Sequence, residues 1–134
     1  MRSSLLLCPL LIVSCASWTP PRNTKDEQKR FDSYEERMGA GYDGTLRTVS
    51  RINVSKPIGE FEAWALRNAY FYTVFGLCGG VERVTDRGTV WVASGAIGIA
   101  GGPAPFIYVD KATGATWAEG RQRITDPRIY AKKI

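Results

Sequence analysis

The segment from Gly59 to Cys78 restricts the fold most, because it is apolar around most of a helical circumference. A row with helical spacing runs along it and consists of Phe61, Trp64, Asn68, Phe71, Phe75 and Cys78. Only Glu60, Glu62 and Arg67 mark a solvent edge. A helix that is apolar on nearly every side is enclosed by other elements. The segment therefore predicts the core helix, stopped by Gly79-Gly80, and its charges rule out a membrane span, which needs about 20 apolar residues.

From Val81 onward the pattern changes to short runs rich in β-branched residues, separated by turn residues. These runs predict strands at 81–84, 89–94, 106–109 and 116–119. Asp110 and Gly114 are expected to form a turn in which Gly114 has a positive φ. Because the connections are short, the strands should form an antiparallel meander. The predicted fold class is α+β, with one long buried helix packed on a small antiparallel sheet.

The region before the core helix has weaker patterns. Thr24 is expected to cap a helix over 25–38 that Gly39 stops. The apolar stripe of this helix is narrow, since it consists of Phe31, Tyr34 and Met38, so we expect a short surface arm rather than a core element. Residues 39–44 are expected to form a turn-rich link, 46–54 a strand, and 126–134 a loose basic tail.

The first fifteen residues, MRSSLLLCPLLIVSC, combine Arg2 with an apolar run that is too short to cross a bilayer and has the size of a signal-peptide core. The run ends in Ile12-Val13-Ser14-Cys15, which resembles the lipobox of bacterial lipoproteins. The domain organisation expected is a signal peptide over 1–14, a lipidated tether over 15–24 and a single α+β domain over 25–134. An ordinary secretory signal with an incidental cysteine is the alternative.

The lipobox resemblance implies that Cys15 receives diacylglycerol, that cleavage follows Ser14, and that an acyl chain such as palmitate is added to the new N-terminus. Several acyl chains anchor a protein stably, whereas one binds reversibly. Ala16 follows the cysteine, in place of the Asp that retains many such proteins at the inner membrane. The implied location is the cell envelope, on the outer membrane facing the periplasm.

The sequence indicates no catalytic residues, metal site or cofactor. It contains no histidine, the commonest general base and a frequent metal ligand, and Cys78 is better explained by packing than as a nucleophile. The glycines near 95–102 lack the lysine and helix of a phosphate-binding loop. Removing residues 1–14 leaves 17 basic and 13 acidic side chains, a net charge of +4. These charges are scattered, so nucleic acid is not an expected partner.

Two features remain as candidates for binding a partner. Asn68 interrupts the aromatic row, and either holds a neighbouring loop backbone or faces a ligand. The loop GAIGIAGGPAPF is too long for a minimal hairpin, and it is either a wide hairpin connection or a recognition loop. Its candidate residues for binding are Gly98, Gly101, Gly102, Pro103 and Pro105.

The stretch from Thr89 to Gly120 resembles the C-terminal part of small bacterial immunity proteins with an NTF2-like, or cystatin-like, α+β fold. The matching residues are Trp91, Gly101, Gly102, Pro103, Phe106, Asp110, Lys111 and Gly114. The resemblance implies a non-enzymatic protein that binds and neutralises a protein toxin. The alternative is a structural or accessory lipoprotein of an envelope or secretion complex, which would dock through its basic surface and the 25–38 arm. A small hydrolase is a third hypothesis, and it lacks catalytic residues.

Overall fold

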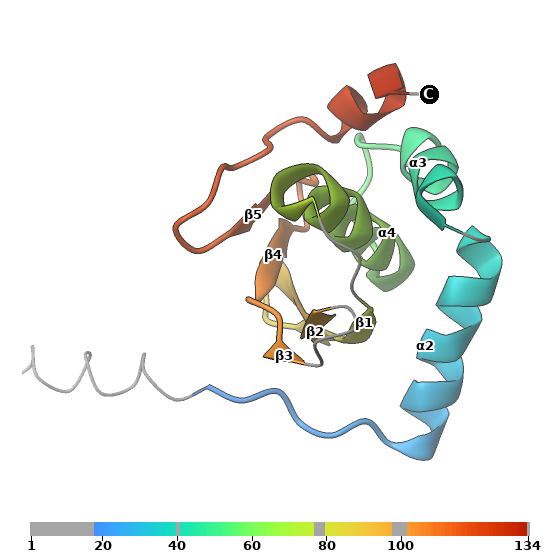
Figure 1. Cartoon of the computed structure of the whole chain (residues 1–134), viewed down its shortest axis with the longest axis vertical. Coiled ribbons are helices and arrows are strands. Elements are labelled where there is room, and N and C mark those ends of the chain that lie inside the picture. Colours follow the sequence, from blue (N-terminus) through green and yellow to red (C-terminus); the bar gives the residue numbers. More distant parts are fainter. Residues whose placement is uncertain (1–17, 40, 77–79, 98–101, 134) are drawn as a thin grey trace, which may run out of the picture.

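The computed structural model describes residues 18–39, 41–76, 80–97 and 102–133. Its helices are α2 (Lys25–Met38), α3 (Gly41–Ser50) and α4 (Glu60–Tyr70), which continues as the π-helical segment η1 (Phe71–Phe75). Its strands are β1 (Val81–Asp86), β2 (Val90–Ile97), β3 (Gly102–Pro103), β4 (Ile107–Asp110) and β5 (Thr116–Ala118), before the 3₁₀ helix η2 (Pro127–Lys133). The predicted α+β class is confirmed, with α4 packed on an antiparallel sheet (Figure 1).

The sheet is the predicted antiparallel meander, with strand order β1-β2-β4-β5. All four predicted strands are present, with ends shifted by at most three residues. In β4 and β5 buried residues alternate with the half-buried Tyr108 and Trp117, so these two rings lie on the face away from α4, the outer face. Strand β3, which pairs with the end of β2, was not predicted, because Gly102-Pro103 has no strand pattern.

The turn between β4 and β5 has the predicted chemistry. The Asp110 carboxylate accepts hydrogen bonds from the backbone N–H groups of Ala112 and Thr113, both at 2.9 Å. Gly114 has a φ of +76°, which places it in the left-handed region that favours glycine.

Helix α4 begins where the aromatic pattern predicts and lies between the sheet and the other helices (Figure 1). Every residue from Ala63 to Phe71 is buried. The predicted stop at Gly79-Gly80 is wrong, because the helical chain already ends at Gly76, whose φ of +65° is left-handed. Cys78 lies outside the described residues. The predicted solvent edge is also wrong in part, because Arg67 is buried.

Helix α2 has the predicted range, and a capping box joins Thr24 and Glu27 at its start. The expectation that it stays outside the core is wrong. Phe31 is 1% exposed and stacks on Trp64 of α4 with 5.1 Å between ring centroids, and Tyr34 and Met38 are also buried. A narrow apolar stripe is sufficient here, because α4 supplies large aromatic partners that periodicity within α2 does not reveal.

The segment predicted as a turn-rich link followed by a strand is helix α3 instead. Its buried side chains include Thr45, Leu46 and Val49, which have helical spacing. Its threonine and valine content favours strands, but packing against α4 and η2 outweighs that local preference.

The tail predicted to be loose is also ordered, as η2. Tyr130 is fully buried, Pro127 lies against the β4–β5 turn, and η2 packs against α3. The basic residues of the tail suggested a solvated segment, whereas Tyr130 belongs to the core.

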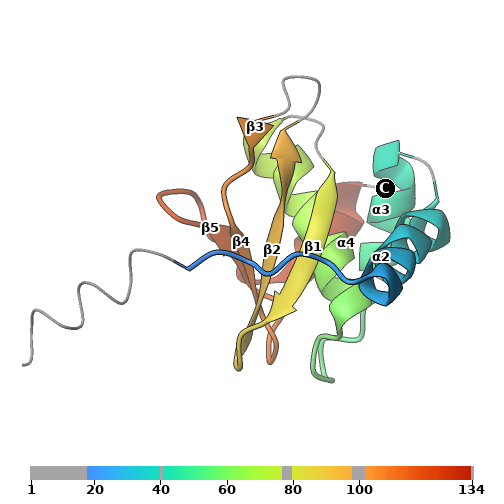
Figure 2. The ribbon, with the colours of Figure 1, turned by 90° about the horizontal axis from the view of Figure 1, so that it is seen from below.

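Residues 18–24 cross the outer face of the sheet on their way to α2 (Figure 2). Asn23 donates a hydrogen bond to the carbonyl of Glu82 in β1 at 2.9 Å and accepts one from Arg83 at 3.0 Å. Of the tether expected over 15–24, the end at Asn23 is thus held on the sheet by side-chain contacts, and residues 15–17 lie outside the described residues.

Replacing Phe31 with alanine tests whether α2 belongs to the core. We expect Phe31→Ala to lower the free energy of unfolding by about 3–5 kcal/mol, the usual cost of removing a buried phenylalanine. Urea denaturation measures the loss. Ile129→Ala is the control, because Ile129 is exposed. Equal, small losses in both variants would mean that α2 lies outside the core.

Glu27 should make part of the stability depend on pH. The backbone N–H of Thr24, at 2.8 Å, and the Arg83 guanidinium lower the pKa of Glu27 from 4.5 to about 2. A carboxylate with a depressed pKa stabilises the fold above its unfolded pKa and loses that effect on protonation. The stability difference between wild type and Glu27→Gln should therefore be full at pH 7 and shrink between pH 4.5 and about 2. A difference that urea denaturation finds constant over this range would contradict the assignment.

Candidate functional site

The described residues of the predicted binding loop, 95–97 and 102–106, lie at one end of the sheet, where β2 and β3 form a hairpin (Figure 2). Strand β2 pairs with β4 as far as Ala93 and with β1 as far as Gly95, and the next two residues, Ala96 and Ile97, pair with β3. The β2–β3 hairpin thus continues beyond the last residues of β2 that pair with β4 and β1. Among the candidates, Gly102 and Pro103 form β3, Pro105 is exposed just after it, and Gly98 and Gly101 lie outside the described residues.

Helix α4 brings Asn68 towards the base of this hairpin through its neighbour Arg67. Asn68 is buried, and its Oδ1 accepts a hydrogen bond from Nη1 of Arg67 at 3.3 Å. Nη2 of Arg67 would lie 3.1 Å from a Cβ built on Gly95 of β2, so the guanidinium reaches the strand at the point where the hairpin begins. The candidates Asn68 and the hairpin are therefore linked by a residue that was not among the candidates.

Arg67 is a buried cation, with only 1% of its surface exposed. Its Cζ lies 4.3 Å from the ring centroid of Phe71, one helical turn further along. Burial lowers the pKa of Arg67 to about 10, and the electrostatic attraction of Glu35, Tyr72 and Glu82 opposes this shift. Since that value is still well above 7, the guanidinium is charged at neutral pH. It serves as a fixed donor and positive charge rather than as a proton-transfer group.

The burial of Arg67 was not predicted from the sequence, because arginine side chains are nearly always solvent-exposed. Arg67 also lies beside Glu60 on the helical projection, and both were therefore assigned to the solvent-exposed edge of the helix. The signal that was available is the adjacent pair Arg67-Asn68, two polar residues inside the otherwise apolar run from Ala63 to Phe71. Polar residues in a buried helix need polar partners. Here Arg67 and Asn68 are hydrogen-bonded to each other.

Gly95 allows the close approach of strands on which the hairpin base depends. A Cβ on Gly95 would lie 2.1 Å from the carbonyl oxygen of Gly80, which is too close for any side chain. The backbone of this region is also bonded, because Ala96 N–H donates to the Gly80 carbonyl at 3.1 Å and Ala104 N–H to the Gly95 carbonyl at 3.0 Å.

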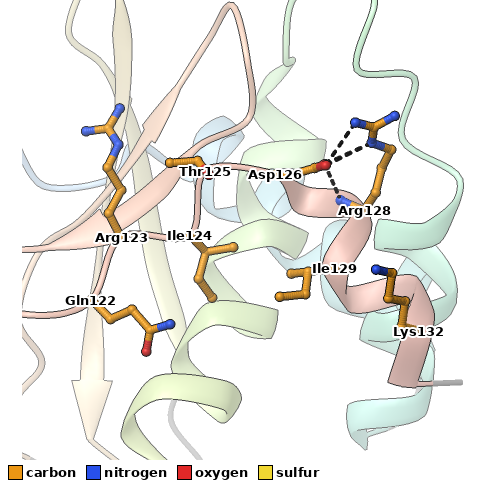
Figure 3. A pocket seen from close by; sticks show the side chains of 8 residues that line it. All are labelled: Gln122, Arg123, Ile124, Thr125, Asp126, Arg128, Ile129 and Lys132. Atoms are coloured by element: carbon orange, nitrogen blue, oxygen red, sulfur yellow. Dashed lines mark hydrogen bonds and ion pairs between the residues drawn. The ribbon is translucent and has the colours of Figure 1, made fainter.

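A second surface feature is an open hollow between the segment after β5 and η2 (Figure 3). Its lining residues are Gln122, Arg123, Ile124, Thr125, Asp126, Arg128, Ile129 and Lys132. Arg128 forms an ion pair with Asp126 at 2.9 Å, and this hydrogen bond lowers the pKa of Asp126. Figure 3 shows Arg123 and Lys132 well apart from each other. The hollow therefore has basic residues at its rim, but they do not converge on one point.

Within the described ranges, no group of three His, Cys, Asp or Glu side chains is placed to hold a metal ion. In the same part of the chain, no helix has the length and apolar character needed to cross a membrane. Cys15 lies outside the described residues.

The comparisons with known proteins found no matching family model, no matching curated protein and no matching solved structure. The lipobox of Cys15 and the likeness to NTF2-like immunity proteins therefore stay predictions from the sequence.

The close approach at Gly95 can be tested with a matched pair of glycines. We expect Gly95→Ala to destabilise the protein by about 1–3 kcal/mol, the typical cost of forcing extra atoms into a packed site. Gly80→Ala is the control, because a Cβ there meets no atom within 4 Å and the backbone is not left-handed. Thermal unfolding of both variants measures the difference. If Gly80→Ala costs as much as Gly95→Ala, the strand spacing at the hairpin base is not the constraint.

Proposed function

We propose that this chain is a lipid-anchored binding protein of the bacterial envelope that neutralises a protein toxin and catalyses no reaction. Two sequence resemblances support the proposal: Ile12-Val13-Ser14-Cys15 is similar to a lipobox, and the stretch from Thr89 to Gly120 is similar to immunity proteins. On this proposal, lipid on Cys15 holds the domain at the outer membrane, facing the periplasm, where it meets toxins delivered by competing bacteria.

The observation that carries the binding role is the β2–β3 hairpin at the end of the sheet, whose base is held by backbone hydrogen bonds at Gly80 and Gly95. The two residues of β2 that follow Gly95 pair with β3, and the buried Arg67 lies against Gly95. A hairpin held at its base in this way loses less conformational entropy when it binds, which favours tight association. Exposed Pro105 adds a stiff position beside the hairpin.

The alternative, an accessory lipoprotein of an envelope complex, depended on the 25–38 helix as a docking arm. The apolar stripe of α2 is occupied, because Phe31, Tyr34 and Met38 belong to the core. That hypothesis keeps only the mildly basic surface, which favours any acidic partner without selecting one. Toxin binding through the hairpin is therefore the better-supported proposal.

Protection against sibling cells tests the proposed function. A strain that lacks the gene should be killed by toxin-producing siblings, and the full-length wild-type protein should restore survival. Pro105→Asp places a charge beside the hairpin. Burying that charge against a toxin should weaken protection about tenfold, which corresponds to a loss of about 1.4 kcal/mol in binding free energy. Cys15→Ala should abolish fatty-acid labelling and protection together.

Ala112→Asp is the matched control, since Ala112 is an exposed position in the turn at the opposite end of the sheet. It should protect as well as wild type at equal protein levels on an immunoblot. Full resistance of the deletion strain would overturn the immunity role. Equal effects of the two aspartate variants would overturn the assignment of the hairpin.

A further inference from the structure

Four aromatic rings on the outer face of the sheet form a patch: Trp18, Phe106, Tyr108 and Trp117. Trp18 contacts Phe106 edge-on with 5.4 Å between centroids, and Tyr108 stacks on Trp117 at 5.6 Å. All four rings are half-buried, so each keeps surface available for contact. Helix α4 lies on the other side of the sheet (Figure 1).

Two exposed arginines lie over this aromatic patch. The guanidinium of Arg87 is 4.3 Å from the ring centroid of Trp18, and that of Arg123 is 4.1 Å from the centroid of Trp117. The outer face thus combines apolar rings with cations at their exposed surfaces. Tryptophan and tyrosine are enriched at membrane interfaces, and arginine is attracted to anionic headgroups.

The path of the chain brings the patch close to the proposed anchor. Cys15 precedes Trp18 by three residues, and three fully extended residues span at most about 11 Å. The polar headgroup layer on each side of a bilayer is roughly 5–7 Å thick. Since Trp18 is held against Phe106, lipid on Cys15 would keep Trp18 within about 11 Å of the anchor, which is at most about two headgroup layers.

We propose that the outer face of the sheet is a membrane-facing surface, which rests on an anionic bilayer through the aromatic patch, Arg87 and Arg123. This inference rests on the proposed lipidation of Cys15. The lipid supplies attachment, and the patch sets the orientation, with the sheet against the headgroups and α4 directed away from them.

Tryptophan quenching in vesicles tests the orientation. The full-length lipidated protein is placed in vesicles of phosphatidylethanolamine and phosphatidylglycerol that contain a lipid with a nitroxide on its headgroup. Two of the four tryptophans lie in the patch, so Trp117→Phe should remove about half of the quenchable emission if interfacial rings are the ones reached. Trp91→Phe is the control, because Trp91 packs against the core on the helix side and donates to the Ile58 carbonyl.

A double variant that reverses two charges tests the same orientation if Trp117→Phe folds poorly. Arg87→Glu with Arg123→Glu should reduce quenching about twofold or more by repelling the anionic surface. Arg47→Glu with Arg51→Glu changes two exposed arginines at the end of α3 and should leave quenching unchanged.

Mass spectrometry of the same preparation distinguishes a failure of the proposed orientation from a failure of the proposed lipidation of Cys15. An unmodified Cys15 would overturn both the anchor and the orientation. A lipidated protein whose quenching is the same for wild type, Trp117→Phe and the Arg87/Arg123 variant would overturn the orientation alone.

Discussion

Helix α4 has almost no face left for solvent, and this constraint fixes where the other elements lie. On one side Trp64 stacks on Phe31 of α2 and meets Tyr34 edge-on. On another side the Tyr70 hydroxyl donates to the Gln122 carbonyl and accepts from the Ala118 N–H of β5 at 3.2 Å. The same helix thus determines the positions of the N-terminal helix, the last strand and the segment that leads to η2.

Arg67 is the buried charge of this helix, and its contacts link the core to the hairpin. Burying a cation carries a large desolvation penalty, which must be offset by close electrostatic and hydrogen-bonding partners. The Phe71 ring, the Asn68 amide and the strand at Gly95 supply close contacts. Moving the hairpin base would disturb these contacts, so the buried charge favours one position of the hairpin over others.

The elements that the sequence predicted are those with local signals. The aromatic row of α4, the capping box of Thr24 and the turn chemistry of Asp110 each depend on residues within a few positions of one another. Helix α3 was missed because its β-branched composition contradicts its structure, and the contacts that decide it come from α4 and η2. Tyr130 was missed for a related reason, since its burial depends on elements far away in the sequence.

The candidate site shows the same difference between local sequence signals and contacts made by distant segments. Asn68 and the glycine–proline loop were recognisable as unusual residues, but their connection passes through Arg67 and Gly95, which are 28 positions apart. Such a connection exists only once α4 packs on β2. A single sequence therefore indicates which residues do not fit a simple core, and the packing determines which of them act together.

The two proposed surfaces fit one geometry. The aromatic patch lies on the outer face of the sheet, whereas the β2–β3 hairpin extends from the end of the sheet (Figure 2). A domain that rests on the bilayer by that face would hold the hairpin along the membrane plane rather than pointing away from it. A partner that meets the hairpin there would itself be close to the lipid surface, and the anchor would limit the orientations in which the two proteins meet. The short link from Cys15 to Trp18 then has a functional consequence, because a longer tether would allow the domain to rotate and the hairpin to leave the membrane plane.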